Sequence, residues 1–83
     1  MALYFVSYDL RKEKDYKPLY DELTKLNAVR ILESIWCFNR YNTHSAVLVT
    51  YLKKFIDSDD GLIVSEVSDW SSYNTDEKPE DLQ

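Results

Sequence analysis

The sequence contains very few of the residues on which several common functional sites depend. Among its 83 residues there is one cysteine, Cys37, one histidine, His44, and one glycine, Gly61. A lone cysteine excludes an intrachain disulfide. A lone histidine excludes a histidine-rich zinc site and leaves His44 as the only histidine for a Ser/His/Asp relay. One glycine cannot form a glycine-rich phosphate-binding loop.

Long apolar runs are also missing. None approaches the roughly 20 residues that span a bilayer, and the N-terminal residues lack the basic and apolar regions of a signal peptide. We therefore expect a cytoplasmic protein with no membrane partner, in which the lone thiol stays reduced.

Charge is distributed unevenly along the chain. Residues 1–56 carry nine Lys/Arg and six Asp/Glu, whereas residues 57–83 carry one and nine, so the net charge of -5 combines plus 3 with minus 8. This balance argues against a polybasic grip on nucleic acid. Hydrophobic residues make up 45%, but a domain this small buries only about 60% of its unfolded surface. We therefore expect a metal or a second subunit to add stability, and favour a dimer.

The first part of the chain predicts a strand followed by a helix. Leu3–Tyr8 is aromatic and rich in strand-forming residues, and the charged residues after it end the strand near Asp9. Apolar residues recur at helical spacing over Tyr16–Leu26. Asp15 is the predicted N-cap, and Asn27, which tolerates the left-handed conformation, is predicted to end the helix.

Further strands and a second helix are predicted next. The apolar stretch Ala28–Tyr41 is too long for one typical strand, so it forms either two antiparallel strands that reverse near Glu33–Ser34 or one continuous bent strand. Asn42–Thr43 is the predicted N-cap of a second helix. Its apolar face consists of Val47, Leu48, Tyr51, Leu52, Phe55 and Ile56.

The last third of the chain predicts one more strand and a tail. Asp57–Gly61 is a helix-to-strand turn, because its glycine is fifth and not sixth as in a calcium-binding loop. Leu62–Val67 is predicted as a strand, and Trp70–Tyr73 as a short additional edge strand. Asp76–Gln83 is charged and nearly free of apolar residues, so we expect a mobile tail.

This element order predicts an α+β protein with the ferredoxin-like βαββαβ fold: one antiparallel sheet with two helices on one face. Residues 1–75 form the single domain, and residues 76–83 an acidic flexible tail. Because helices cover one face only, we expect a homodimer that forms through the other face or an edge strand. Both alternating residue sets of the first strand are largely apolar, as in a strand buried on both faces.

Two short motifs resemble the Cas2 proteins of CRISPR systems, and the neighbouring VapD-like and SinR-like small proteins. Ser7-Tyr8-Asp9-Leu10 matches the end of their first strand, and Arg30-Ile31-Leu32-Glu33-Ser34-Ile35-Trp36 the following strand. The resemblance implies a ferredoxin-like homodimer and, in some members, a divalent-metal-dependent nuclease whose two strand-end aspartates face each other. Carried over by position, Asp9 is the catalytic and metal-binding residue, with Mg²⁺ or Mn²⁺. Supporting residues are Tyr8, Arg30, Ser34 and Trp36.

Each candidate residue also has a structural interpretation. Asp9 suits metal-assisted phosphodiester hydrolysis, or it ends the strand or caps the loop. Arg30 holds a phosphate, or it pairs with Glu33 or Asp9. Arg11 and Lys12 follow a nucleic-acid backbone, or belong to a solvated loop.

The hypothesis from sequence is a Cas2-like homodimer that binds RNA or DNA in a CRISPR or toxin-antitoxin-like defence setting and acts as a Mg/Mn-dependent endonuclease (endoribonuclease). The alternative is a non-catalytic module on the same fold, a scaffold or nucleic-acid-mimicking anti-defence binder within a larger protein complex, suggested by the acidic C-terminal part. A third option is a small-ligand regulatory domain. Cys37 is predicted as an inert buried thiol, and His44 as a solvent-facing residue at the start of the second helix.

Overall fold

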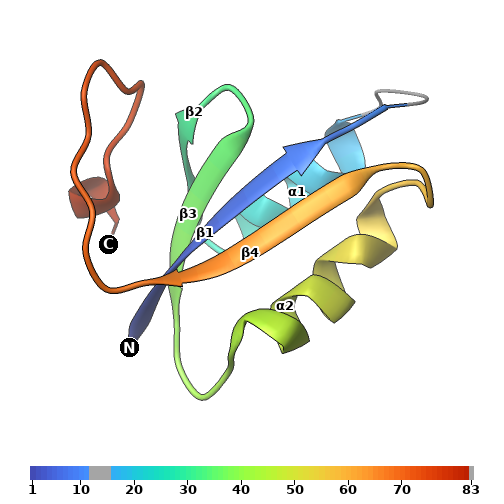
Figure 1. Ribbon diagram of the computed structural model, residues 1–83, viewed down its shortest axis with the longest axis horizontal. Coiled ribbons are helices and arrows are strands. Elements are labelled where there is room, and N and C mark those ends of the chain that lie inside the picture. Colours follow the sequence, from blue (N-terminus) through green and yellow to red (C-terminus); the bar gives the residue numbers. More distant parts are fainter. Residues whose placement is uncertain (12–15, 83) are drawn as a thin grey trace.

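A computed structural model, which describes residues 1–11 and 16–82, has the predicted ferredoxin-like βαββαβ arrangement (Figure 1). Its single sheet has the strand order β2-β3-β1-β4, and every neighbouring pair is antiparallel. The strands are β1 (Ala2–Asp9), β2 (Val29–Leu32), β3 (Ile35–Arg40) and β4 (Gly61–Val67), and the helices are α1 (Lys17–Lys25) and α2 (Ser45–Leu52), with short 3₁₀ helices η1 (Lys53–Phe55) and η2 (Pro79–Asp81). The predicted fold class is confirmed.

The central strand β1 divides the molecule into two faces. Tyr4, Val6 and Tyr8 are buried on one face, where they form one core cluster with leucines of both helices. Successive side chains of a strand point to opposite faces, so Phe5 and Ser7 lie on the second face, and both are only half-buried. The prediction that both helices cover one face is therefore confirmed, and the second face is the less covered one.

The ends of α1 agree in part with the prediction. The helix begins at Lys17 with Tyr16 at the N-cap position and no side-chain cap, whereas the predicted cap, Asp15, lies outside the described residues. Asn27 has a φ of 59°, the left-handed conformation expected after the helix.

Between the helices, β2 and β3 form a hairpin that turns at Glu33–Ser34. This confirms the two-strand alternative for residues 28–41.

The start of α2 differs from the prediction. His44, and not Asn42–Thr43, is at the N-cap position, and Asn42 adopts a left-handed turn with a φ of 53°. The Tyr4 hydroxyl donates to the Thr43 carbonyl oxygen at 2.9 Å. This tertiary contact holds Thr43 in the linker before α2, whereas residue propensity alone predicted a helix cap there.

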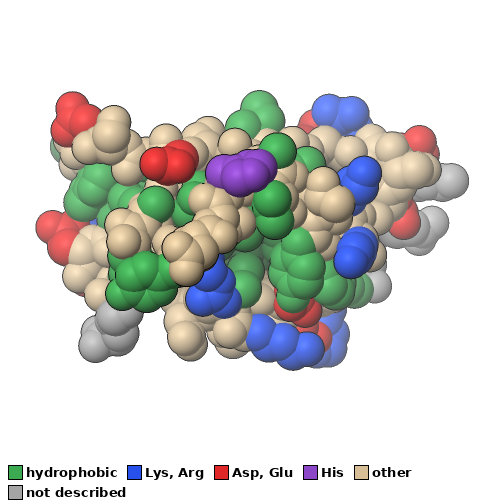
Figure 2. Space-filling model, turned by 90° about the horizontal axis from the view of Figure 1, so that it is seen from below, with side chains coloured by type: hydrophobic (Ala, Val, Ile, Leu, Met, Phe, Trp, Pro, Cys, Tyr) green, Lys and Arg blue, Asp and Glu red, His purple; other side chains and the backbone are tan. Residues whose placement is uncertain are grey.

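The predicted apolar face of α2 is partly wrong, because Val47 is 50% exposed while Leu48 and Leu52 are buried. The helix is apolar around most of its circumference, so its periodicity does not define which side packs inward. Figure 2 shows hydrophobic side chains at the surface beside Lys and Arg on this side of the molecule. Within residues 1–11 and 16–82, no helix has the length and apolar character needed to cross a bilayer.

The C-terminal segment, residues 70–82, turns back along β2 and β3 (Figure 1). Trp70–Tyr73 forms no strand, contrary to the prediction; one hydrogen bond, from the Asp76 N–H to the Ile31 carbonyl oxygen at 2.9 Å, joins the segment to the sheet edge. Pro79 is buried. Residues 76–82 therefore pack against the domain, and the mobility of the predicted tail 76–83 stays a prediction.

This segment covers part of the second face of the sheet. A cavity of about 200 Å³ lies beneath it, lined by Phe5 and Ile35 of the sheet and by Trp70, Tyr73 and Pro79 of the segment, among others. Hollows of about 400 and 440 Å³ lie along α2 and beside residues 53–60, so cavity volume does not argue against the small-ligand alternative. The β4 side is left open, because Ile63 is 65% exposed.

Candidate metal and nucleic-acid site

Strand alternation at the end of β1 separates the residues of the first motif. Tyr8 points into the core on the helix face, whereas Asp9 points away from it and its side chain is 69% exposed. In the sheet register Asp9 lies opposite Gly61, the first residue of β4. The candidate metal ligand therefore stands at the rim of the less covered face.

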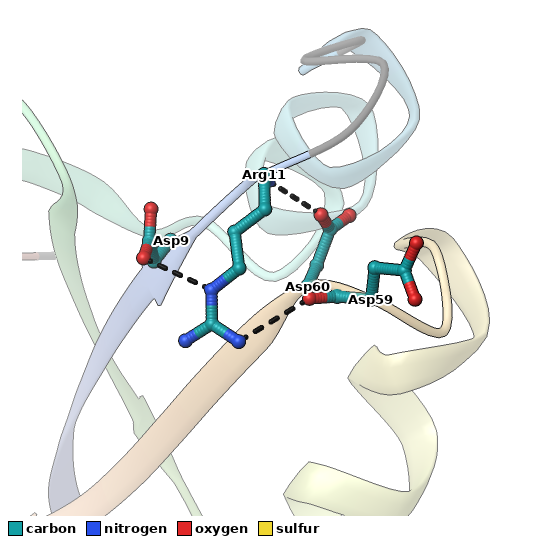
Figure 3. A network of polar contacts seen from close by, with 4 residues as sticks. All are labelled: Asp9, Arg11, Asp59 and Asp60. Carbon is teal, nitrogen blue, oxygen red and sulfur yellow. Dashed lines mark hydrogen bonds and ion pairs between the residues drawn. The ribbon is translucent and has the colours of Figure 1, made fainter.

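Arg11 joins Asp9 to the loop before β4 (Figure 3). Its Nε donates to Asp9 Oδ2 at 3.1 Å, and its Nη1 donates to the Asp59 carbonyl oxygen at 3.3 Å. Its backbone N–H donates to Asp60 Oδ1 at 2.7 Å. Asp9 thus belongs to a surface ion pair in which both side chains are more than half exposed, while Lys12 lies outside the described residues.

Asp9 provides only one carboxylate per chain. Among the described residues, no three His, Cys, Asp or Glu side chains are grouped so that they could hold a metal ion. Mg²⁺ keeps several waters and binds through one or two carboxylates, so the donor chemistry fits a divalent ion when a second Asp9 is supplied by another copy of the chain.

Tyr8 belongs to a buried hydrogen-bonded cluster beneath the hairpin turn. Its hydroxyl accepts from Trp36 Nε1 at 3.2 Å and lies 3.1 Å from both the Tyr20 hydroxyl and the Glu33 carbonyl oxygen. Burial, and then the hydrogen bond with Tyr20, raise the pKa of Tyr8 well above its ordinary value of 10. The phenol stays protonated near neutral pH, so it cannot act there as a general base.

Arg30 is turned toward the same cluster. Its guanidinium carbon lies 4.9 Å from the centroid of the Tyr20 ring, and its Nε and Nη2 donate to the Glu33 carbonyl oxygen at 3.1 and 2.6 Å. Of the sequence alternatives, the structure therefore favours pairing with Glu33, through the backbone carbonyl and not the carboxylate.

Ser34 lies exposed in the hairpin turn, and its carbonyl oxygen accepts from the Tyr8 N–H at 3.2 Å. Tyr8, Arg30, Ser34 and Trp36 thus gather at one turn, and Asp9 and Arg11 form a separate pair on the other face. The residues that the motifs group together therefore lie at two different places: four at the hairpin turn beside the end of β1, and two on the other face.

The remaining candidates are distant or inert. β3 ends at Arg40, opposite Ala2, so His44 begins α2 roughly 20 Å along the strand from Asp9. His44 is exposed, as predicted. Cys37 is fully buried, as predicted, and burial together with the charge of Asp81 raises its pKa to about 11, which disfavours the reactive thiolate.

Sequence analysis missed Asp60 and Gly61 as neighbours of Asp9. The segment 57–61 is recognisable as a turn, but nothing local indicates which residue it will meet. Gly61 itself could have indicated this contact, because a glycine in a strand often marks a place where another group approaches closely.

A comparison with protein families identifies a match. A family model described as CRISPR associated protein Cas2 matches residues 1–75, which include all four strands, both α-helices and every candidate residue. No solved structure matches the chain. The match ends before the acidic residues 76–83.

Proposed function

The chain belongs to the CRISPR associated protein Cas2 family, and from this premise we propose that it acts as a homodimer that binds RNA or DNA and hydrolyses phosphodiester bonds with Mg²⁺ or Mn²⁺ held between two Asp9 side chains. The observation that carries the proposal is the position of Asp9: an exposed carboxylate on the less covered face of the sheet, at the end of the central strand. A two-fold interface repeats every group, so pairing through this face supplies the missing second carboxylate.

The open part of the second face suggests which half of the sheet pairs. The segment 70–82 covers the side of β2 and β3, while Ile63 on β4 keeps 65% of its surface exposed. Ile63 pairs with Ser7, two residues before Asp9. A dimer whose two-fold axis passes beside Ile63 and Ser7 would therefore bring the two β1 ends, and with them both Asp9 carboxylates, close to that axis.

In this site Asp9 contributes the hard oxygen ligands, one carboxylate from each subunit. A divalent cation, when bound, supplies Lewis-acid chemistry for phosphodiester hydrolysis. Arg11 lies beside Asp9 with its guanidinium more than half exposed, so its charge favours the approach of a phosphate. Tyr8 and Trp36 act from the opposite side of β1, where they fix the end of the strand.

The test compares Asp9→Asn with the matched variant Asp21→Asn. Asp21 is also an exposed aspartate in one ion pair, with Lys17 at 2.9 Å, but it lies on α1. Cleavage of single-stranded RNA and duplex DNA is measured with Mg²⁺, Mn²⁺ or EDTA. We expect Asp9→Asn to lose at least about 100-fold, since even outer-shell partners of metal ligands cost about 10–100-fold, and Asp21→Asn to stay near wild type. Equal cleavage by Asp9→Asn would remove Asp9 from the mechanism.

A second candidate is a non-catalytic scaffold in a larger protein complex. It is favoured by the acidic C-terminal segment, in which Asp76, Glu77 and Glu80 are exposed. A hydrogen bond with Asp81, and then its charge, raise the pKa of Glu77, a sign of crowded negative charge that a basic partner would relieve. If Asp9→Asn retains nucleic-acid binding and the wild type never cleaves, the scaffold is the better assignment.

A further inference from the structure

The only glycine of the chain lies directly beneath the Arg11 side chain. A Cβ atom at Gly61 would stand 2.9 Å from Arg11 Nη2 and 3.5 Å from its Cζ. Real Cβ atoms do not approach polar atoms that closely, so any side chain at this position displaces the guanidinium. The φ angle of Gly61 is not positive. Position 61 therefore needs glycine for the space that it leaves and not for its backbone conformation.

The space at Gly61 is what allows Arg11 to fold back onto Asp9. Gly61 and Asp9 are register partners, so a guanidinium that lies over the glycine is within reach of the carboxylate beside it. The Asp59 carbonyl oxygen holds Nη1, and Asp60 holds the backbone N–H of Arg11. The arrangement at residues 59–61, which we call the arginine seat, thus fixes both ends of Arg11 (Figure 3).

Within the seat, the Arg11 guanidinium places its positive charge next to an Asp9 carboxylate oxygen. In the proposed site a divalent cation would neutralise the same oxygen. A carboxylate oxygen that accepts a charge-assisted hydrogen bond is less available to a cation, and the cation is repelled by the adjacent guanidinium. When two chains pair, two Arg11 side chains also offset the repulsion between the two Asp9 carboxylates.

We propose that Arg11, held in the seat over Gly61, is a positioning residue that occupies Asp9 until a divalent cation replaces it, and so sets the cation concentration at which the site fills. This inference rests on the proposed function, because it concerns the same carboxylate. Gly61 is then a functional residue although it bears no side chain.

Gly61→Ala isolates the effect, because the added methyl group meets only the far end of a flexible side chain. The variant keeps every charge and suits a strand better than glycine does. Binding of Mn²⁺ is followed by electron paramagnetic resonance of the free ion, which does not require cleavage. We expect Gly61→Ala to bind Mn²⁺ up to about fivefold more tightly, the range that exposed ion pairs contribute.

Two further variants separate the seat from general electrostatics. Arg11→Gln removes the guanidinium, so it should tighten Mn²⁺ binding at least as much, and adding Gly61→Ala to it should have no further effect because both act through one contact. Arg40→Gln removes the same charge at the opposite end of the sheet, where Arg40 pairs with Ala2, and should leave binding unchanged. Unchanged or weaker binding in Gly61→Ala, or full additivity with Arg11→Gln, would overturn the proposal.

A measurement without metal distinguishes failure of the seat from failure of the proposed function. In EDTA, the Nε–H resonance of Arg11 in ¹⁵N-labelled protein should be protected from exchange with water, and this protection should be lost in Gly61→Ala. Protection without any Asp9-dependent Mn²⁺ binding would refute the metal site and leave the seat intact as a structural contact. Exchange as fast as in Gly61→Ala would refute the seat even if Mn²⁺ binds at Asp9.

Discussion

Tyr8→Phe tests the interpretation that Tyr8 secures the end of β1 and takes no part in the chemistry. The substitution removes one oxygen atom and leaves the aromatic core packing in place. In the native chain this oxygen accepts from Trp36 Nε1 and donates to one of two acceptors, the Tyr20 hydroxyl or the Glu33 carbonyl oxygen. Both of these bonds disappear in the variant.

The expected cost follows from which groups are left without a partner. The Glu33 carbonyl oxygen keeps its two hydrogen bonds from Arg30, but the buried Trp36 indole N–H loses its acceptor. A lost hydrogen bond costs about 1 kcal/mol and a buried unsatisfied donor about 1–3 kcal/mol, so we expect the free energy of unfolding to fall by about 2–4 kcal/mol. For a domain of this size that corresponds to a fall in melting temperature of roughly 10–30 °C.

Urea unfolding followed by circular dichroism measures this loss, with Tyr41→Phe as the control. Tyr41 is 65% exposed, so the control should lie within about 0.5 kcal/mol of wild type. The metal-dependent cleavage of folded Tyr8→Phe should equal that of wild type, because the hydroxyl lies on the face opposite Asp9. A stability loss below about 0.5 kcal/mol would refute the hydrogen-bonding argument, and a selective loss of cleavage would refute the division of roles.

Three other predictions concern the second face of the sheet. Ile63→Glu should convert a dimer to a monomer in sedimentation analysis while Val47→Glu, on the exposed side of α2, does not; equal behaviour of the two variants would refute pairing through β4. Burial and the charge of Asp81 raise the pKa of Cys37 to about 11 from its ordinary 9.0, so the stability this thiol contributes is complete below pH 9 and lost as the pH rises through 11. A chain ending at Thr75 lacks Pro79 and Asp81, so its Cys37 should react faster with a disulfide reagent at pH 8; an unchanged rate would show that residues 76–82 do not protect it.

Local patterns in the sequence account for most of the fold. The aromatic and strand-forming residues of β1 and the period of three to four in α1 give the type of both elements, and Asn27 marks the helix end by its tolerance of positive φ. Because side chains alternate along a strand, the sequence also predicts that Tyr8 and Asp9 point in opposite directions. The prediction of the inward face of α2 is partly wrong, because a helix that is apolar on nearly all sides has no unique inward face. Val47 was predicted to face the core but is exposed.

The C-terminal segment could not be predicted in the same way. Residues 70–82 have no regular period, and Pro79 is buried beside apolar residues of β2 and β3. A segment with few apolar residues carries no local signal for the surface that it contacts. The extra strand predicted at Trp70–Tyr73 fails for the same reason, since pairing requires a free sheet edge in the right place.

By itself the sequence determined the elements, their order and the exposed carboxylate at the end of the first strand, because these depend on residues close together along the chain. Only the tertiary structure decided what Asp9 meets: Arg11 contacts Asp60 across 49 residues, and Gly61 provides the space for it. Such contacts depend on strand register and loop path, which the packing of the whole sheet fixes and no local pattern encodes.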